Sequence, residues 1–217
     1  MDTKTLYRWL FASLASLSLI VASFFLIDRP LARLMAKFHL FQALLNRAPV
    51  ELPVMIALAC LAVLLGGSYL AAGKRLPKWV AAGMLAGLAL VWSLCLTEFL
   101  LKPLFGRTLP IAYLQTGQYG FHWFHLGDAF GSFPSGHADQ VTSILSVLWV
   151  FYPRWRWVYV GALALLAFAL LLGEWHFLSD IIAGSFIGTA SGVLTMQIWE
   201  TVQAQSQGPR NSVEKKY

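Results

Sequence analysis

Charged residues are scarce in this chain. Asp, Glu, Lys and Arg make up 12% of the 217 positions, whereas apolar residues make up 58%. A soluble domain typically carries about 25% charged residues, so the composition argues against a soluble fold and indicates a membrane protein. A segment of roughly 20 mainly apolar residues spans a bilayer. The chain has six such runs, the fourth and fifth being the shortest: 7–27, 52–73, 79–101, 138–153, 157–174 and 179–200.

Cysteine is almost absent, and the two that occur, Cys60 and Cys95, lie inside apolar runs. They are expected to pack as small apolar side chains, so the sequence predicts neither a disulfide framework nor a thiol nucleophile. The first apolar run lacks a small-residue cleavage site, which predicts a retained span rather than a signal peptide. Internal repeats and low-complexity stretches are absent too. We expect one transmembrane domain over 1–200 and a polar, disordered cytoplasmic tail over 201–217.

The net charge of +6 is explained by membrane topology, and we expect no nucleic-acid partner. Lys and Arg concentrate in short loops on the cytoplasmic side of membrane proteins. With the N-terminus inside, ten of the 16 Lys and Arg residues fall on that side and six on the other. The ten are Lys4, Arg8, Lys74, Arg75, Lys78, Arg154, Arg156, Arg210, Lys215 and Lys216. The six are Arg29, Arg33, Lys37, Arg47, Lys102 and Arg107.

Polar motifs at the ends of three apolar runs fall on one side of the membrane in this topology. The segment Lys102–Arg107 follows the third run, Pro134–His137 precedes the fourth, and His176–Asp180 follows the fifth. Six spans with the N-terminus inside put all three motifs on the outer face. This agreement predicts that the motifs form one site.

The pair His176 and Asp180 suits nucleophilic catalysis. If a helix starts here, their four-residue spacing puts both side chains on one face. A carboxylate hydrogen-bonded to one ring nitrogen fixes the tautomer and leaves the other nitrogen free as a nucleophile. The alternative is an interfacial His beside an acid that offsets the helix dipole.

The motif Pro134-Ser135-Gly136-His137 suits phosphate binding at the start of a helix. Free N–H groups at a helix N-terminus bind phosphate, and Pro and Gly favour the turn that precedes it. Ser135 adds a hydroxyl donor, and His137 can protonate a leaving alkoxide. Lys102 and Arg107 can neutralise the phosphate. An ordinary ion pair between Glu98 and Lys102 is the alternative for that segment.

Taken together, the segments Lys102–Pro110, Pro134–His137 and His176–Asp180 resemble the three-part signature of the type 2 phosphatidic acid phosphatase superfamily. The resemblance implies that His176 forms a phosphohistidine, that Asp180 orients it, and that His137 protonates the leaving group. It also implies a reaction that needs no metal or cofactor. The positions that match phosphate-holding residues of the family are Lys102, Ser135 and Gly136.

Two positions depart from that signature. Leu109 stands where the family pattern has the Arg of its first motif, and Leu170 stands where it has the Arg of its third. We predict that Arg107 replaces the first of these guanidiniums. Arg makes bidentate contacts with phosphate that Leu cannot make, so slower turnover, a less charged substrate or a cation recruited from elsewhere are all open.

The loop 119–128 is rich in aromatic residues and contains His122 and His125. One interpretation is a substrate loop that covers the site, and the other is an aromatic belt that anchors the chain at the interface. A metal site built from His122, His125 and Asp128 is disfavoured, because the three lack a recognised ligand spacing. A second segment, 29–45, has the pattern of an amphipathic helix lying in the interface. It either anchors the chain or draws anionic lipids toward the site.

We therefore expect an all-helical membrane protein with six transmembrane helices and one interfacial amphipathic helix. Its predicted function is removal of phosphate from a membrane lipid at the outer face of a bacterial inner membrane. The candidate substrates are a prenyl diphosphate, phosphatidylglycerol phosphate, phosphatidic acid and a lipid A phosphate. Two other functions stay open: a non-catalytic lipid-phosphate binding protein, and a lipid phosphotransferase that uses an acceptor other than water.

Overall fold

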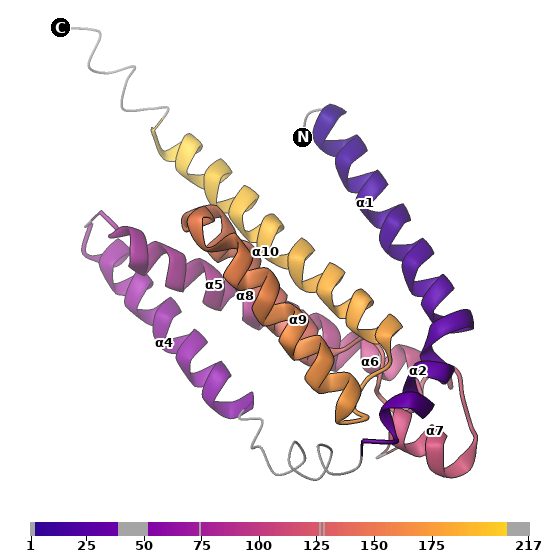
Figure 1. Ribbon diagram of the computed structural model, residues 1–217. Helices are drawn as coiled ribbons and strands as arrows, with labels where there is room; N and C mark the ends of the chain where they lie inside the picture. The colour runs from indigo at the N-terminus through magenta and orange to yellow at the C-terminus, as the bar shows by residue number, and fades with distance from the viewer. Residues whose placement is uncertain (1–2, 39–51, 74, 126, 128, 208–217) are drawn as a thin grey trace, which may run out of the picture.

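The structure is a computed structural model, and it describes residues 3–38, 52–73, 75–125, 127 and 129–207. Within these ranges the regular structure is helical, with two isolated bridges, Arg107 to Phe121 and Thr108 to Phe130. The predicted all-helical fold class is confirmed. Figure 1 shows the long helices gathered into a bundle.

Helices occupy all six predicted apolar runs, because only a backbone that satisfies its own hydrogen bonds is stable in lipid. In chain order the elements are α1 (Thr3–Ala22), the π-helix η1 (Ser23–Ile27), α2 (Asp28–Met35), α4 (Leu52–Ala71), α5 (Lys78–Leu94), the π-helix η2 (Cys95–Leu101), α6 (Lys102–Phe105), α7 (Pro110–Thr116), α8 (Gly136–Phe151), the short 3-10 helix η3 (Pro153–Trp155), α9 (Arg156–Leu172) and α10 (Leu178–Gln207).

Among the described residues, four helical segments are long and apolar enough to cross a membrane by length and composition. They are Thr3–Met35, Lys78–Phe105, Pro153–Leu172 and Leu178–Gln205. The two remaining predicted runs correspond to α4, whose apolar stretch is Leu58–Ala71, and to α8, which has 16 residues. Helix α8 is shorter than these four segments, whereas α4 has 20 residues over its full length, and the count of six spans stays a prediction.

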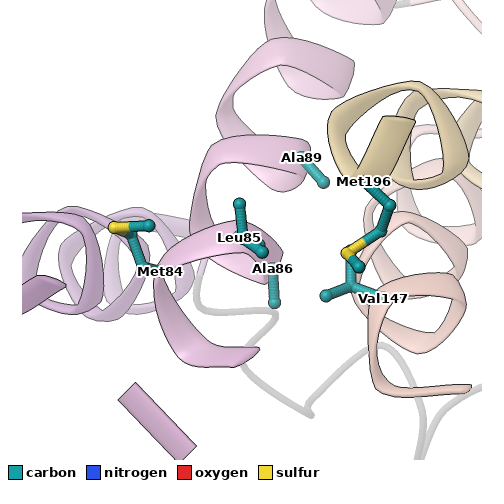
Figure 2. Close-up of a cluster of buried hydrophobic side chains, with 6 residues drawn as sticks. All are labelled: Met84, Leu85, Ala86, Ala89, Val147 and Met196. Carbon is teal, nitrogen blue, oxygen red and sulfur yellow. The ribbon is translucent and has the colours of Figure 1, made fainter. Parts of the chain in front are cut away.

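The helix α8 lies at the centre of the bundle and packs against α5 and α10. A cluster of buried side chains joins the three helices (Figure 2). Its members are Met84, Leu85, Ala86 and Ala89 of α5, Val147 of α8 and Met196 of α10. This apolar contact fixes the positions of the two helices that begin at the polar motifs.

Three glycines bring α10 into direct contact with α8. A Cβ added at Gly184, Gly188 or Gly192 would overlap atoms of α8. The backbone carbonyls that it would meet follow the same four-residue spacing and belong to Ser135, Asp139 and Ser143. Small residues at this spacing let helices approach closely in membranes. As a result the starts of the two helices meet, and the Ser135 N–H donates to the Asp180 carbonyl at 3.0 Å.

The motifs gather at one end of the bundle, as the predicted topology requires. Figure 1 shows α2, α6, α7 and the start of α10 at this end, whereas the N-terminus and the last turns of α10 lie at the opposite end. An even number of membrane crossings puts the first and last helices' outer ends on the same side, as seen here. The side of the membrane that each end faces stays a prediction.

Two predicted boundaries differ from the structure. The helix α10 continues to Gln207, so the start of the predicted tail, 201–207, is helical and extends the last helix beyond its apolar run. Residues 208–217 lie outside the described ranges. The predicted interfacial helix 29–45 is shorter than expected: its first residues form α2, which ends at Met35, and residues 36–38 are not helical. The rest of that prediction lies outside the described ranges. Helix α2 bends away from the axis of α1 (Figure 1).

Replacing Gly188 by Ala tests the close contact between α8 and α10. The added methyl meets a backbone carbonyl that cannot move aside, so we expect a loss of about 1–3 kcal/mol in stability. The measurement is the thermal unfolding temperature in mild detergent. The matched control is Gly161→Ala on α9, where nothing lies within 4 Å of the added atom. Equal unfolding temperatures for the two variants would contradict the packing described.

Candidate active site

The two predicted catalytic histidines face each other at the junction of α8 and α10. His137 is the second residue of α8, and His176 lies two residues before α10 begins. Their ring centroids are 5.9 Å apart, with the planes at 68°. The ring of Trp175 stacks on the ring of His137, with the centroids 5.8 Å apart and the planes at 25°. The structure therefore brings together the residues that sequence analysis predicts as nucleophile and acid.

The ring of His176 is oriented by a backbone carbonyl. Its Nδ1 lies 2.9 Å from the carbonyl oxygen of Ser132. A carbonyl can only accept, so Nδ1 carries the proton and the lone pair of the neutral ring is on Nε2. This is the tautomer needed for attack through Nε2. The sequence predicts Asp180 as the hydrogen-bond partner instead, but the Asp180 Oδ2 lies 4.0 Å from Nδ1.

Asp180 does not reach the ring because other donors hold its carboxylate. Its Oδ2 accepts the Ser132 hydroxyl at 2.5 Å and the Phe177 N–H at 2.7 Å. Its Oδ1 accepts a hydrogen bond from Arg107. Asp180 is fully buried. Asp180 is therefore connected to His176 through Ser132, whose hydroxyl donates to Asp180 and whose carbonyl accepts the His176 Nδ1–H.

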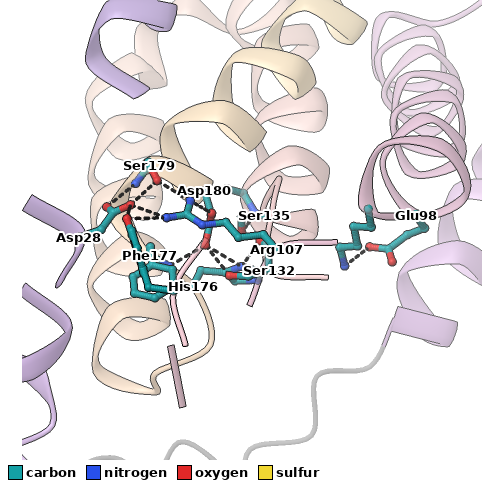
Figure 3. A network of polar contacts seen from close by, with 12 residues as sticks. Asp28, Glu98, Arg107, Ser132, Ser135, His176, Phe177, Ser179 and Asp180 are labelled. Carbon is teal, nitrogen blue, oxygen red and sulfur yellow. Dashed lines mark hydrogen bonds and ion pairs between the residues drawn. The ribbon is translucent and has the colours of Figure 1, made fainter. Parts of the chain in front are cut away.

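Arg107 lies in a different position from the one predicted for a phosphate ligand. Its side chain is fully buried, and its guanidinium donates four hydrogen bonds inside the protein. Figure 3 shows it between Asp28, Ser179 and Asp180. The four acceptors are Ser179 at 2.6 Å, Asp28 at 2.7 Å, Tyr119 at 3.0 Å and Asp180. Five aromatic rings surround the guanidinium: Phe24, Tyr119, Phe121, Phe133 and Phe177. Two carboxylates form ion pairs with this cation, so few of its N–H groups are available to a substrate phosphate.

Lys102 lies beside the N-terminus of α8, as predicted for a phosphate-holding residue. Its ammonium forms an ion pair with Glu98 at 2.7 Å, the alternative that the sequence also offers. The pair lies against Gly136, because a Cβ there would overlap Glu98 and come within 3.3 Å of the Lys102 Nζ. Ser135 is the N-cap of α8, and its hydroxyl oxygen accepts the Ala138 N–H at 3.4 Å. The absence of a side chain at Gly136 thus lets the ion pair lie directly against the helix end.

The two leucines that replace the expected arginines take no part in a charged site. Leu170 is 1% exposed and packs with Ala138 and Ile181 in an apolar cluster. Leu109 precedes α7, and its N–H donates to the Ala129 carbonyl at 2.9 Å. Among the predicted phosphate ligands, Lys102 is therefore the cation that the structure places at the end of α8.

The predicted substrate loop packs on the segment that carries Arg107. The His122 N–H donates to the Gly106 carbonyl at 3.1 Å, and Gly106 adopts a φ of 51° where a side chain would overlap the His122 carbonyl. The rings of His122 and His125 lie 5.0 and 5.1 Å from the ring of Phe130 in the same loop. A role for the two histidines in covering a substrate stays a prediction.

Burial and neighbouring cations keep His176 neutral. Burial is the largest cause that lowers the pKa of His176, to about 3, and the positive charge of His137 and of Lys102 acts in the same direction. The pKa of His137 is also lowered, first by burial and then by Lys102, while Glu98 acts in the opposite sense. A neutral imidazole with its lone pair on Nε2 is the form that attacks phosphorus.

Sequence reasoning misses three residues of this cluster: Asp28, Ser132 and Ser179. A carboxylate next to an apolar run is a signal that Asp28 could have supplied, because ionisable residues at membrane depth are usually functional. Ser132 acts mainly through its backbone carbonyl, which no side-chain pattern reveals. Ser179 lies between two predicted site residues, and its hydroxyl donates to Asp28 at 2.5 Å.

Comparison with known proteins places the chain in a family. A family model described as the PAP2 superfamily matches residues 86–204. Two lipid A 1-phosphatases, from Rhizobium johnstonii and Rhizobium etli, are 32% and 31% identical over 96 and 100 residues, which is 44% and 46% of this chain. The matches cover 39% and 43% of those proteins, so the chain spans about two fifths of the length of these curated relatives.

A solved structure is also similar over most of the chain. It is a crystal structure of a transmembrane PAP2-type phosphatidylglycerolphosphate phosphatase from Bacillus subtilis, with 18% sequence identity and a TM-score of 0.35. The alignment covers 83% of this chain and 96% of that one.

The buried, neutral His176 predicts a pH-dependent stability. The unfolded chain takes up a proton on this residue below about pH 6.5, whereas the folded state resists protonation until about pH 3. The contribution of His176 to the free energy of unfolding is therefore fully present above about pH 6.5. It is lost as the pH decreases, by up to about 1.4 kcal/mol per pH unit. We expect His176→Gln to make the unfolding temperature in detergent less dependent on pH between about pH 7 and pH 5.

The control for this measurement is His125→Gln, which replaces an exposed histidine. Parallel curves of unfolding temperature against pH for wild type and His176→Gln would show that His176 is not held neutral by the fold.

Proposed function

We propose that this chain, which belongs to the PAP2 superfamily, removes phosphate from a lipid phosphate through a phosphohistidine on His176. The observation that carries the proposal is the facing pair of His176 and His137 at the N-terminus of α8, with Lys102 beside it. Helix N-termini bind phosphate through their free N–H groups and their dipole. The phosphate would therefore lie between the two rings and the end of α8.

In the first step, the Nε2 lone pair of His176 attacks the phosphorus and the bond from phosphorus to the lipid oxygen breaks. His137 gives its proton to the departing oxygen, so that a neutral lipid alcohol leaves. The Nδ1–H bond to the Ser132 carbonyl stabilises the positive charge that develops on the His176 ring. Lys102 offsets the charge of the phosphate oxygens once it exchanges Glu98 for the substrate.

In the second step, water attacks the phosphorus and the phosphorus–nitrogen bond breaks. His137, now neutral, accepts the proton of the attacking water, and inorganic phosphate leaves. Both steps use the same pair of rings, with His137 acting first as an acid and then as a base. This requires His137 to bind a proton next to the phosphate, and an anionic substrate favours that by raising its pKa.

An apolar groove near the site suits the hydrocarbon chain of a lipid. It has a volume of about 530 Å³ and lies between α1, α9 and α10. Its walls include Ser16, Leu163, Ala167 and Ile181. Ile181 follows Asp180 and packs with Leu170, so the groove begins beside the catalytic end of the bundle. We propose that it holds one chain of the substrate.

The relatives suggest which lipid to test first. Two of them are named lipid A 1-phosphatase, and we propose a lipid A 1-phosphate as the leading substrate. Phosphatidic acid, phosphatidylglycerol phosphate and a prenyl diphosphate are the comparison substrates. We place the enzyme in a bacterial inner membrane with its site at the outer face. The excess of Lys and Arg predicted on the opposite side supports this orientation.

The test is release of inorganic phosphate from each of these lipids by protein purified in detergent. We expect His176→Ala to lower the rate by on the order of a thousandfold or more, because the nucleophile is lost. His137→Ala should lower it by about a hundredfold to ten-thousandfold, the usual contribution of a general acid. Glu200→Gln, at an exposed position of α10 far from the site, is the control.

Equal rates for wild type and His176→Ala would contradict the mechanism. Binding of the lipids without release of phosphate, unchanged in His176→Ala, would favour a binding protein that has kept the fold. Leu170, buried where the family pattern has an arginine, is the observation that motivates this second function.

A further inference from the structure

An acidic residue of the first helical segment reaches the catalytic end of the bundle. Asp28 follows directly after the π-helical stretch Ser23–Ile27, within the membrane-spanning segment Thr3–Met35. Extra residues in a π-helix rotate the side chains that follow them, and such stretches are frequent at functional sites. Asp28 is 1% exposed. A carboxylate buried at this depth is costly unless it is paired.

The carboxylate of Asp28 is paired at both oxygens. Its Oδ1 accepts the Ser179 N–H at 3.0 Å. Its Oδ2 accepts the Arg107 guanidinium at 2.7 Å and the Ser179 hydroxyl at 2.5 Å. Ser179 belongs to the first turn of α10, where an acid also offsets the helix dipole. Asp28 thereby fixes two things at once: the start of α10 and the position of Arg107.

From Arg107 the chain of contacts continues to the nucleophile. The guanidinium binds Asp180, and the Asp180 carboxylate binds the Ser132 hydroxyl (Figure 3). The Ser132 carbonyl then holds Nδ1 of His176. The Arg107 carbonyl strengthens the same link, because it accepts the Ser132 N–H at 3.1 Å. Each contact in this series is buried, so water cannot substitute for a lost partner.

The charges of the cluster matter as well as its geometry. Asp28 and Asp180 carry two negative charges against the one positive charge of Arg107, so the cluster keeps a net negative charge. The Asp180 Oδ2 of this cluster lies 4.0 Å from Nδ1 of His176. The ring becomes positive when Nε2 bonds to phosphorus, and this negative charge stabilises that state. Without Asp28, Arg107 alone would neutralise Asp180.

We propose that Asp28 and Arg107 are positioning residues that act on His176 through Asp180 and Ser132, and that this cluster supports the nucleophile rather than the substrate. The inference rests on the proposed function, since it assumes that His176 attacks phosphorus. It assigns Arg107 to the nucleophile's support instead of the phosphate cradle. Asp28 lies far upstream of the three motifs and completes the catalytic apparatus.

Asp28→Asn tests the proposal because it keeps the size of the side chain and removes its charge. We expect kcat for phosphate release to fall about tenfold to a hundredfold, as for a lost charge-assisted hydrogen bond, while KM changes little. Asp28→Glu should recover part of the loss. A large rise in KM with unchanged kcat would overturn the proposal, because Asp28 would then act on substrate binding.

A double variant shows whether Asp28 acts through Arg107. We expect Arg107→Gln to lower kcat as well, and Asp28→Asn to add little in that background. Additive losses would overturn the proposed series of contacts. The matched controls carry the same chemical changes at exposed positions, Glu200→Gln and Arg156→Gln. If Asp28→Asn does not fold, Tyr119→Phe removes the hydrogen bonds that the Tyr119 hydroxyl makes with both Arg107 and Asp28 and keeps the charges of the cluster, and a kcat equal to that of wild type would overturn the proposal.

A measurement independent of turnover separates this inference from the proposed function. Nitrogen-15 NMR of histidine-labelled protein reports which ring nitrogen of His176 carries the proton. We expect Nδ1–H in the wild type and a mixture of tautomers in Asp28→Asn. An unchanged Nδ1–H signal together with an unchanged kcat would overturn the inference. Absence of phosphate release from any lipid in the wild type would refute the proposed function alone, because the tautomer would still respond to Asp28→Asn.

Discussion

The guanidinium of Arg107 bridges two buried carboxylates from distant parts of the sequence, Asp28 and Asp180. A buried cation is stable only with such partners, and a buried carboxylate needs the cation in turn. The bridge therefore connects the start of α2 to the start of α10. Asp180 accepts a hydrogen bond from the Ser132 hydroxyl and makes none with the ring of His176. The orientation of His176 depends on this one cation.

The phosphate side of the site is built differently. It consists of a helix N-terminus, Lys102 and the facing His137, and Leu170 is buried in an apolar cluster instead of lying at the site. Glu98 lowers the positive charge there, because its carboxylate is paired with Lys102. The site is therefore well equipped for nucleophilic attack and sparsely equipped for charge neutralisation. We propose that this balance favours substrates with less phosphate charge.

The sequence predicts the helices well, because an apolar run in lipid has few alternatives to a helix. It also predicts that Lys102, His137 and His176 meet, since alternating spans put their ends on one side. The position of Arg107 could not be predicted, because its partners are set by tertiary packing and not by the spacing of its motif. The role of Asp28 could not be predicted for a similar reason. The direction of its side chain depends on the π-helical stretch Ser23–Ile27, which the pattern of apolar residues does not reveal.

The proposed mechanism requires that the fold presents Nε2 of His176 to the phosphorus. The most direct measurement traps the intermediate with a phosphorus-32-labelled lipid phosphate under alkaline quench, which preserves phosphohistidine. Mass spectrometry then identifies the labelled residue, and phosphorus-31 NMR distinguishes phosphate on Nε2 from phosphate on Nδ1. We predict label on His176 at Nε2, since Nδ1 is bound to the Ser132 carbonyl. Label on Nδ1, on another residue, or phosphate release without any labelled enzyme would contradict the account.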